Sequence, residues 1–125
     1  FVEAKAAYES GGFSGIGYVV TADAVTTSRR PAMVDDGITG VDLDHVVDPE
    51  TGAIQPCAQL IVDRLCSYTE ISPSGAGLRI FVYAQLPPKD RKLGHFECYE
   101  SSRYLTVTGN HLPGPPPPSS IAKTK

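Results

Sequence analysis

The spacing of apolar and polar positions predicts two helices and six strands. Helical spacing predicts a short amphipathic helix over residues 1–10, ended by Gly11 and Gly12, and a second helix that begins at Pro56. Strands are predicted by runs rich in β-branched and aromatic residues, which cover 15–24, 38–47, 67–72, 78–86, 95–100 and 103–109. Residues 25–37 contain turn residues without a clear period, and this predicts an exposed loop.

The later strands predict two hairpins. Strands 67–72 and 78–86 are joined by "SPSGAG", whose serines, proline and glycines predict a tight and elaborate connection. Strands 95–100 and 103–109 are separated only by the "SSR" turn, so we expect them to pair with each other.

The two ends of the chain differ from its middle. The stretch "LPGPPPPSSIAKTK" predicts an extended polyproline tail. We therefore expect one domain over residues 1–112 and a flexible Pro-rich linker over 113–125. The chain opens at Phe1 in the middle of a helical pattern, and we expect a domain truncated at its N-terminus.

Composition narrows the class of protein. With 125 residues, 41% of them apolar and 20% charged, the chain is expected to form one ordinary globular domain. The formal charge of -3 argues against a protein that coats nucleic acid by bulk electrostatics. Three cysteines without CxxC spacing indicate neither a disulfide framework nor a zinc site, and favour the cytoplasm. Because no apolar run approaches about 20 residues, no membrane association is expected.

The stretch "GVDLDHV" places two carboxylates inside an apolar run. In a strand, Asp42 and Asp44 would share one face, about 7 Å apart, while Val41 and Leu43 take the other. Like charges so close are costly unless a cation or a hydrogen-bond network neutralises them, and hard Mg²⁺ or Mn²⁺ prefers carboxylate oxygens. The alternative is a solvent-exposed strand end.

The Ser/Gly stretch has the composition of an anion-binding loop. Gly75 and Gly77 permit close approach, Ser72 and Ser74 offer hydroxyls, and Arg79 adds a positive fork suited to phosphate. The alternative is an ordinary hairpin loop that happens to be rich in serine and glycine.

A third acid, Glu97, lies in an apolar context within a predicted strand. On a strand beside Asp42 and Asp44 it would complete a three-carboxylate site. The alternative is a solvated Glu97 on an edge strand with Arg103 as its surface partner, a weak kind of pair.

Three motifs taken together resemble a known family. In order and spacing, "GVDLDHV", "SYTEISPSGAGLRIFV" and "FECYESSRYLTVTGN" look like the primase-polymerase domains of phage and plasmid replication proteins, in the archaeo-eukaryotic primase superfamily. The resemblance covers most of residues 1–112. It implies an α/β (α+β) catalytic domain with an RRM-like, mainly antiparallel sheet flanked by helices. It also implies template-dependent nucleotidyl transfer, as a DNA primase and polymerase, with two Mg²⁺ or Mn²⁺ ions.

The resemblance also assigns roles to residues. Asp42, Asp44 and Glu97 match the family's metal-binding catalytic carboxylates. The positions that match its nucleotide-binding part are Ser72, Ser74, Gly75, Gly77, Arg103 and Tyr104. The implied partners are nucleoside triphosphates, a single-stranded DNA template and, beyond the tail, a helicase domain or other replication proteins.

Three features depart from the family pattern. Arg79 stands where the family usually carries a histidine that contacts the incoming nucleotide's phosphates, and arginine stays protonated near pH 7. The loop before the acidic strand is longer than usual, and the family's domains begin earlier, with a strand and basic residues. These departures motivate two alternatives: a degenerate domain that only binds DNA or a replication protein, and a nucleotide-binding regulatory module. Neither His45 nor His95 has a spaced metal-ligand partner in the sequence.

Overall fold

The computed structural model describes residues 2–13, 15–20, 37–84, 92–99 and 103–113, without the side chains of 18–20 and 103. Helices and antiparallel strands are mixed in this α+β fold, as expected. In chain order, the elements are α1 (Val2–Glu9), β1 (Ile16–Val20), β2 (Ile38–Leu43), α2 (Pro56–Leu65), β3 (Thr69–Ile71), β4 (Leu78–Tyr83), β5 (Lys92–Leu93), β6 (Phe96–Tyr99) and β7 (Arg103–Val107).

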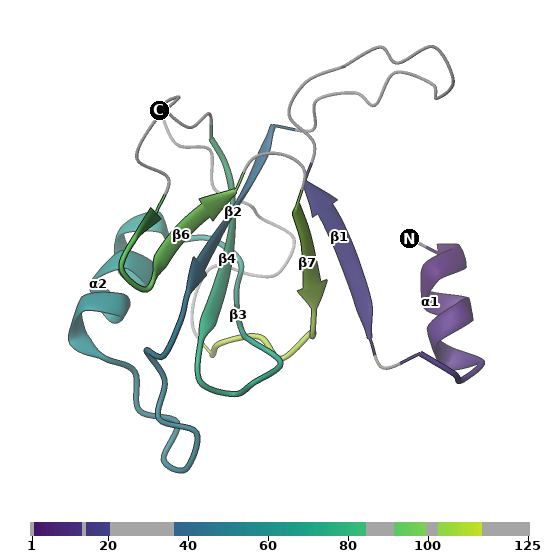
Figure 1. Cartoon of the computed structure of the whole chain (residues 1–125), viewed down its shortest axis with the longest axis horizontal. Helices are drawn as coiled ribbons and strands as arrows, with labels where there is room; N and C mark the ends of the chain where they lie inside the picture. The colour runs from purple at the N-terminus through teal and green to yellow at the C-terminus, as the bar shows by residue number, and fades with distance from the viewer. Residues whose placement is uncertain (1, 14, 21–36, 85–91, 100–102, 114–125) are drawn as a thin grey trace.

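The strands form two antiparallel sheets (Figure 1). The larger has the order β3-β4-β2-β6-β5, and the smaller pairs β1 with β7. The predicted hairpin of β3 and β4 is confirmed. The predicted pairing of β6 with β7 is wrong, because β6 lies between β2 and β5 while β7 pairs with β1. A short turn signal indicates neighbouring strands in the chain but does not choose their partners, which depend on the apolar faces that must be buried.

Helix α2 covers one face of the larger sheet (Figure 1). Strand alternation directs Val41 and Leu43 to this face, as predicted, where both are buried. The helix contributes the apolar face that its spacing predicted, with Ala58 fully buried. The other members of that face, partly buried against the same core, are Ile61, Val62 and Leu65.

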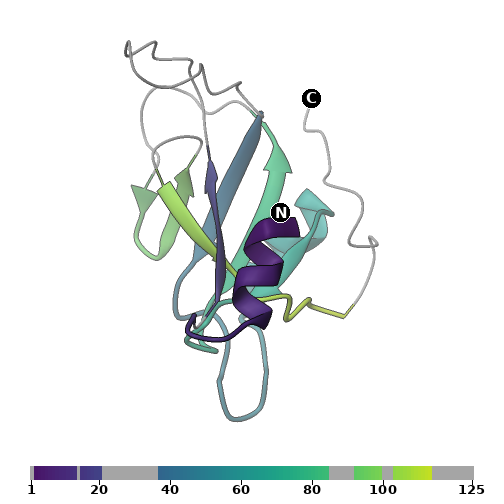
Figure 2. The ribbon, with the colours of Figure 1, turned by 90° about the vertical axis from the view of Figure 1, so that its right-hand side faces the viewer.

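Strand β7 crosses the opposite face of the larger sheet (Figure 2). Its Leu105 is 3% exposed and packs on Phe81 of β4. A Cβ atom on Gly40 would lie 2.1 Å from Cδ1 of Leu105, so a larger residue there would force the Leu105 side chain to shift. One face of the sheet therefore carries the main core, and the other is partly covered by β7.

The ends of several elements differ from the predictions. Strand β2 stops at Leu43, short of the predicted 38–47, because the chain turns at Asp44 and His45. Helix α1 is present as predicted but buries none of its residues. Most of the loop over 25–37 and the tail from residue 114 onward lie outside the described residues. Among the helices that are described, none has the length and apolarity to cross a membrane.

Candidate active site

A row of five charged residues crosses the larger sheet, one from each strand. The register places Glu70 opposite Arg79, Arg79 opposite Asp42, Asp42 opposite Glu97, and Glu97 opposite Lys92. Residues directly opposite each other in an antiparallel sheet share a face. All five positions therefore lie on the face that β7 crosses, away from α2.

Asp42 and Glu97 are adjacent in this row. Both side chains are largely shielded, at 17% and 14% exposure. The alternative of a solvated Glu97 on an edge strand is wrong, because β6 is an inner strand and its Glu97 forms an ion pair with Lys92. The structure thus brings together two of the three acids named from the sequence.

Asp44, the third acid, follows β2 in an exposed turn. Its backbone N–H donates to the carbonyl oxygen of His95 at 2.9 Å, which holds the turn against the end of β6. It lines a pocket of about 420 Å³ together with His45 and His95. The centroids of the two imidazole rings lie 5.5 Å apart, edge to face. The sequence did not predict this ring contact, because 49 residues separate the two histidines.

The pKa of Asp42 reflects this crowding. Burial, as the largest cause, raises the pKa of this carboxyl above its ordinary 3.8. The Arg79 guanidinium opposes that rise, while the charges of Asp44 and Glu97 add to it. Asp42 is therefore close enough to both other acids to be repelled by their charges, and this donor chemistry suits a hard divalent cation. Within the described part of the chain, no three His, Cys, Asp or Glu side chains are already grouped to hold a metal ion.

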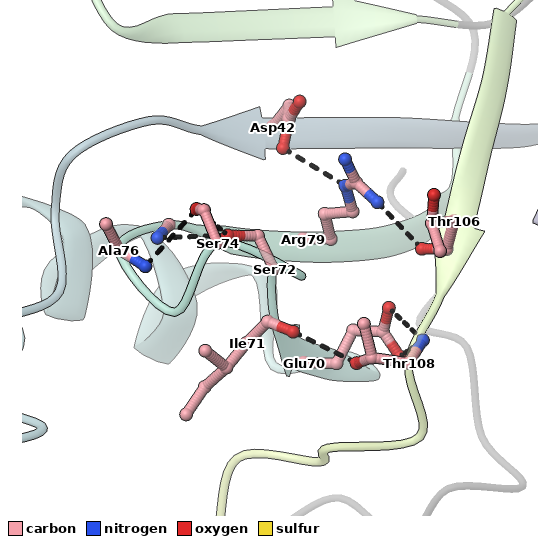
Figure 3. A network of polar contacts seen from close by, with 10 residues as sticks. Asp42, Glu70, Ile71, Ser72, Ser74, Ala76, Arg79, Thr106 and Thr108 are labelled. Atoms are coloured by element: carbon pink, nitrogen blue, oxygen red, sulfur yellow. Dashed lines mark hydrogen bonds and ion pairs between the residues drawn. The ribbon is translucent and has the colours of Figure 1, made fainter. Parts of the chain in front are cut away.

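Arg79 bridges the larger sheet and β7. Its Nε lies 3.4 Å from Oδ1 of Asp42, and its Nη1 donates to the carbonyl oxygen of Thr106 at 2.8 Å (Figure 3). The guanidinium, expected from the sequence to bind phosphate, already has an acidic and a backbone partner in this structure.

The Ser/Gly loop is closed by its own hydrogen bonds. The hydroxyl of Ser72 accepts from the Gly77 amide at 3.1 Å and lies 3.0 Å from the Ser74 hydroxyl, which accepts from Ala76 (Figure 3). The amides of Ser72 and Gly75 also donate within the loop. In this conformation the hairpin therefore uses these amides and hydroxyls for its own hydrogen bonds.

Two positions in this loop favour glycine, each for a different structural reason. Gly75 has a φ of 76°, in the left-handed region that favours glycine. A Cβ on Gly77 would lie 2.8 Å from the carbonyl oxygen of Leu43, so the close approach expected of Gly77 is to β2. The carbonyl oxygen of Ala76 in this loop also accepts hydrogen bonds from the backbone amides of Val46 and Val47. These contacts hold the loop beside the turn that carries Asp44.

Tyr104 does not join the acidic row. It alternates with the sheet-facing Leu105 along β7, is 60% exposed, and its ring covers the backbone of Gly17 in β1. Arg103 pairs with Val20 through the backbone, and its side chain lies outside the described part.

Glu70 is a buried acid that sequence reasoning missed. It has no exposed surface, and its carboxylate accepts the amides of Thr108 and Gly109, at 3.0–3.2 Å, and the hydroxyl of Tyr68 at 3.1 Å. Burial, with the nearby Glu70 charge, raises the pKa of Tyr68 to about 12. The sequence feature that could have identified Glu70 is a single acid within a predicted strand. Lys92 was missed because its two-residue strand has no periodicity.

Comparison with known proteins adds one relative. No protein-family model matches the chain. It is 35% identical over 118 residues to the DNA primase-polymerase of Nitratiruptor phage NrS-1, covering 90% of this chain and 15% of the phage protein. The likeness therefore extends over nearly all of this chain but only a small part of the relative. The identity over 90% of this chain, with the acidic and Ser/Gly motifs in family order, supports a primase-polymerase domain, and the archaeo-eukaryotic primase superfamily is the coarser fit.

Proposed function

We propose that this domain catalyses template-dependent nucleotidyl transfer, as a DNA primase and polymerase in the replication of a phage or plasmid. The observation that carries the proposal is the placement of Glu97 directly opposite Asp42 on neighbouring strands. The similar phage protein is named a DNA primase-polymerase. The proposed substrates are nucleoside triphosphates and a single-stranded DNA template, and the proposed partners are a helicase domain or other replication proteins.

In this proposal Asp42, Asp44 and Glu97 hold Mg²⁺ or Mn²⁺. The support is the repulsion of Asp42 by the charges of Asp44 and Glu97, which a divalent cation would relieve. When bound, two such ions activate the attacking hydroxyl and neutralise charge on the triphosphate. The chain itself contributes a rigid base for the acids, since β2 and β6 are inner strands of one sheet. Because the side chains of Asp42 and Glu97 are mostly shielded from water, their charges act strongly on a bound cation.

The Ser/Gly loop is proposed to position the triphosphate. It lies beside Asp44, with a Cβ on Gly77 falling 3.6 Å from the Asp44 Cα atom. Ser74 is exposed, so its hydroxyl is accessible to a ligand. The loop amides would have to exchange their internal bonds for phosphate oxygens, because Ser72 and Gly75 donate within the hairpin.

Primer extension tests the proposal. We expect the wild-type chain to incorporate nucleotides with Mg²⁺ or Mn²⁺, and Asp42→Asn to lower incorporation by about 100-fold or more, because it removes a metal ligand. Asp63→Asn is the matched control, since Asp63 is exposed on α2, across the sheet from the acids. Equal incorporation by the wild type and Asp42→Asn would refute the proposal.

A second candidate function is a degenerate domain that binds DNA or a replication protein without catalysis. The specific observation in its favour is that the Arg79 guanidinium already pairs with Asp42 and donates to the Thr106 carbonyl oxygen. Titration with Mn²⁺ separates the two functions: binding that Asp44→Ala abolishes favours the enzyme, and no binding favours the degenerate domain. A nucleotide-sensing domain would bind a triphosphate without consuming it.

A further inference from the structure

We infer that Lys92 is the resident counter-ion of Glu97 and that a divalent cation must displace it to bind. The inference rests on the proposed function, because it concerns the same acidic site. It deepens that function by naming a residue that sets the affinity of the site for its metal.

The order of charges across the sheet supports this role. From β4 to β5 the row runs Arg79, Asp42, Glu97 and Lys92, so the two acids are adjacent and each has a cation on its outer side. Adjacent like charges in a sheet are destabilising. The flanking cations offset that repulsion when no metal is bound, and they compete with a metal for the same carboxylate oxygens.

The two cations are held differently. Arg79 is 16% exposed and is fixed by a second bond to the Thr106 carbonyl oxygen. Lys92 is 70% exposed, and the Glu97 carboxylate is the partner that the structure gives its ammonium group. A lysine on a flexible stem leaves such a contact at little cost. Lys92 is therefore the cation that yields, while Arg79 stays with Asp42.

The position of Lys92 in the sheet allows its side chain to move without its backbone. It lies in the two-residue strand β5, at the edge of the larger sheet, directly opposite Glu97. Its backbone stays paired with β6 when the side chain swings into solvent. Exchange of lysine for metal thus requires no movement of the strands that carry the acids.

Titration of the full 125-residue chain with Mn²⁺, followed by the electron paramagnetic resonance signal of the free ion, tests the inference. We expect Lys92→Met to bind Mn²⁺ about three- to tenfold more tightly than the wild type, because one competing charge is removed. Lys92→Arg keeps the charge and should bind as the wild type does. Lys5→Met is the control for net charge, since Lys5 pairs with Glu9 on the remote helix α1. Circular dichroism confirms that each variant is folded.

The outcomes separate this inference from the proposed function. Mn²⁺ binding that Asp42→Asn abolishes but Lys92→Met leaves unchanged or weakens would overturn the role of Lys92 and leave the metal site standing. An equal gain in Lys5→Met would overturn it too, as a general charge effect. Binding that Asp42→Asn does not affect would overturn both proposals.

Discussion

Nε of Arg79 lies 3.4 Å from Oδ1 of Asp42, so the central acid of the site has a fixed cation partner before any ligand arrives. The same guanidinium holds β7 through the Thr106 carbonyl oxygen. Arg79 therefore contributes both to charge neutralisation at Asp42 and to the docking of β7, and substitutions of Arg79 affect both.

Arg79→His installs the residue that the family usually carries. We expect the free energy of unfolding to fall by about 1–3 kcal/mol, because imidazole is too short to bond to both Asp42 and Thr106. Incorporation in primer extension should rise, since Asp42 is released from its ion pair. Arg79→Lys is the control, because it keeps the charge without the planar fork. Unchanged or lower incorporation by Arg79→His would show that the arginine is a working variant.

Asp42 gives a pH dependence of known sign. Its pKa is raised in the folded chain, so the folded state binds this proton more tightly than the unfolded state does. The stability contributed by Asp42 therefore falls as pH rises from below 3.8 through the raised pKa. We expect the stability of Asp42→Asn relative to the wild type to be greater at pH 7 than at pH 3.5. Urea unfolding at the two pH values measures this, and a difference that is the same at both would contradict it.

Glu70 fixes the end of β7 to β3. We expect Glu70→Ala to lower the free energy of unfolding by about 3 kcal/mol, because the amides of Thr108 and Gly109 lose a buried charged acceptor. Urea denaturation measures the loss. Glu50→Ala, in an exposed turn, is the control and should change stability by less than about 0.5 kcal/mol. A similar loss in both variants would show that the buried carboxylate has no special role.

Gly40 and Leu105 form a steric pair that a double-mutant cycle can isolate. We expect Gly40→Ala to destabilise the chain by about 1–3 kcal/mol, because its Cβ would overlap Cδ1 of the buried Leu105. Leu105→Ala removes that atom but leaves a cavity. The double variant should therefore be more stable than the sum of the two single effects predicts. Strictly additive effects would mean that β7 does not approach Gly40 as closely as the structure indicates.

Local patterns were sufficient for most elements. The 3.6-residue period from Pro56 predicted α2 and its buried face, and alternation around Asp42 predicted which residues of β2 face the core. Turn chemistry predicted the β3–β4 hairpin. These features depend on residues close together in the chain, where dihedral preferences and side-chain periodicity act directly. The same patterns did not predict β5, which is too short to show a period.

The sequence by itself determined the acids, the Ser/Gly loop and the strands that carry Asp42 and Glu97, because each is a property of a short stretch. Only the tertiary structure decided that β6 pairs with β2, which sets Glu97 opposite Asp42, and that Arg79, Lys92 and Glu70 share their row. It also decided that Tyr104 faces away from that row and that His45 meets His95. The physical reason is that strand partners are chosen by the joint burial of apolar faces from distant segments, and no local pattern contains that choice.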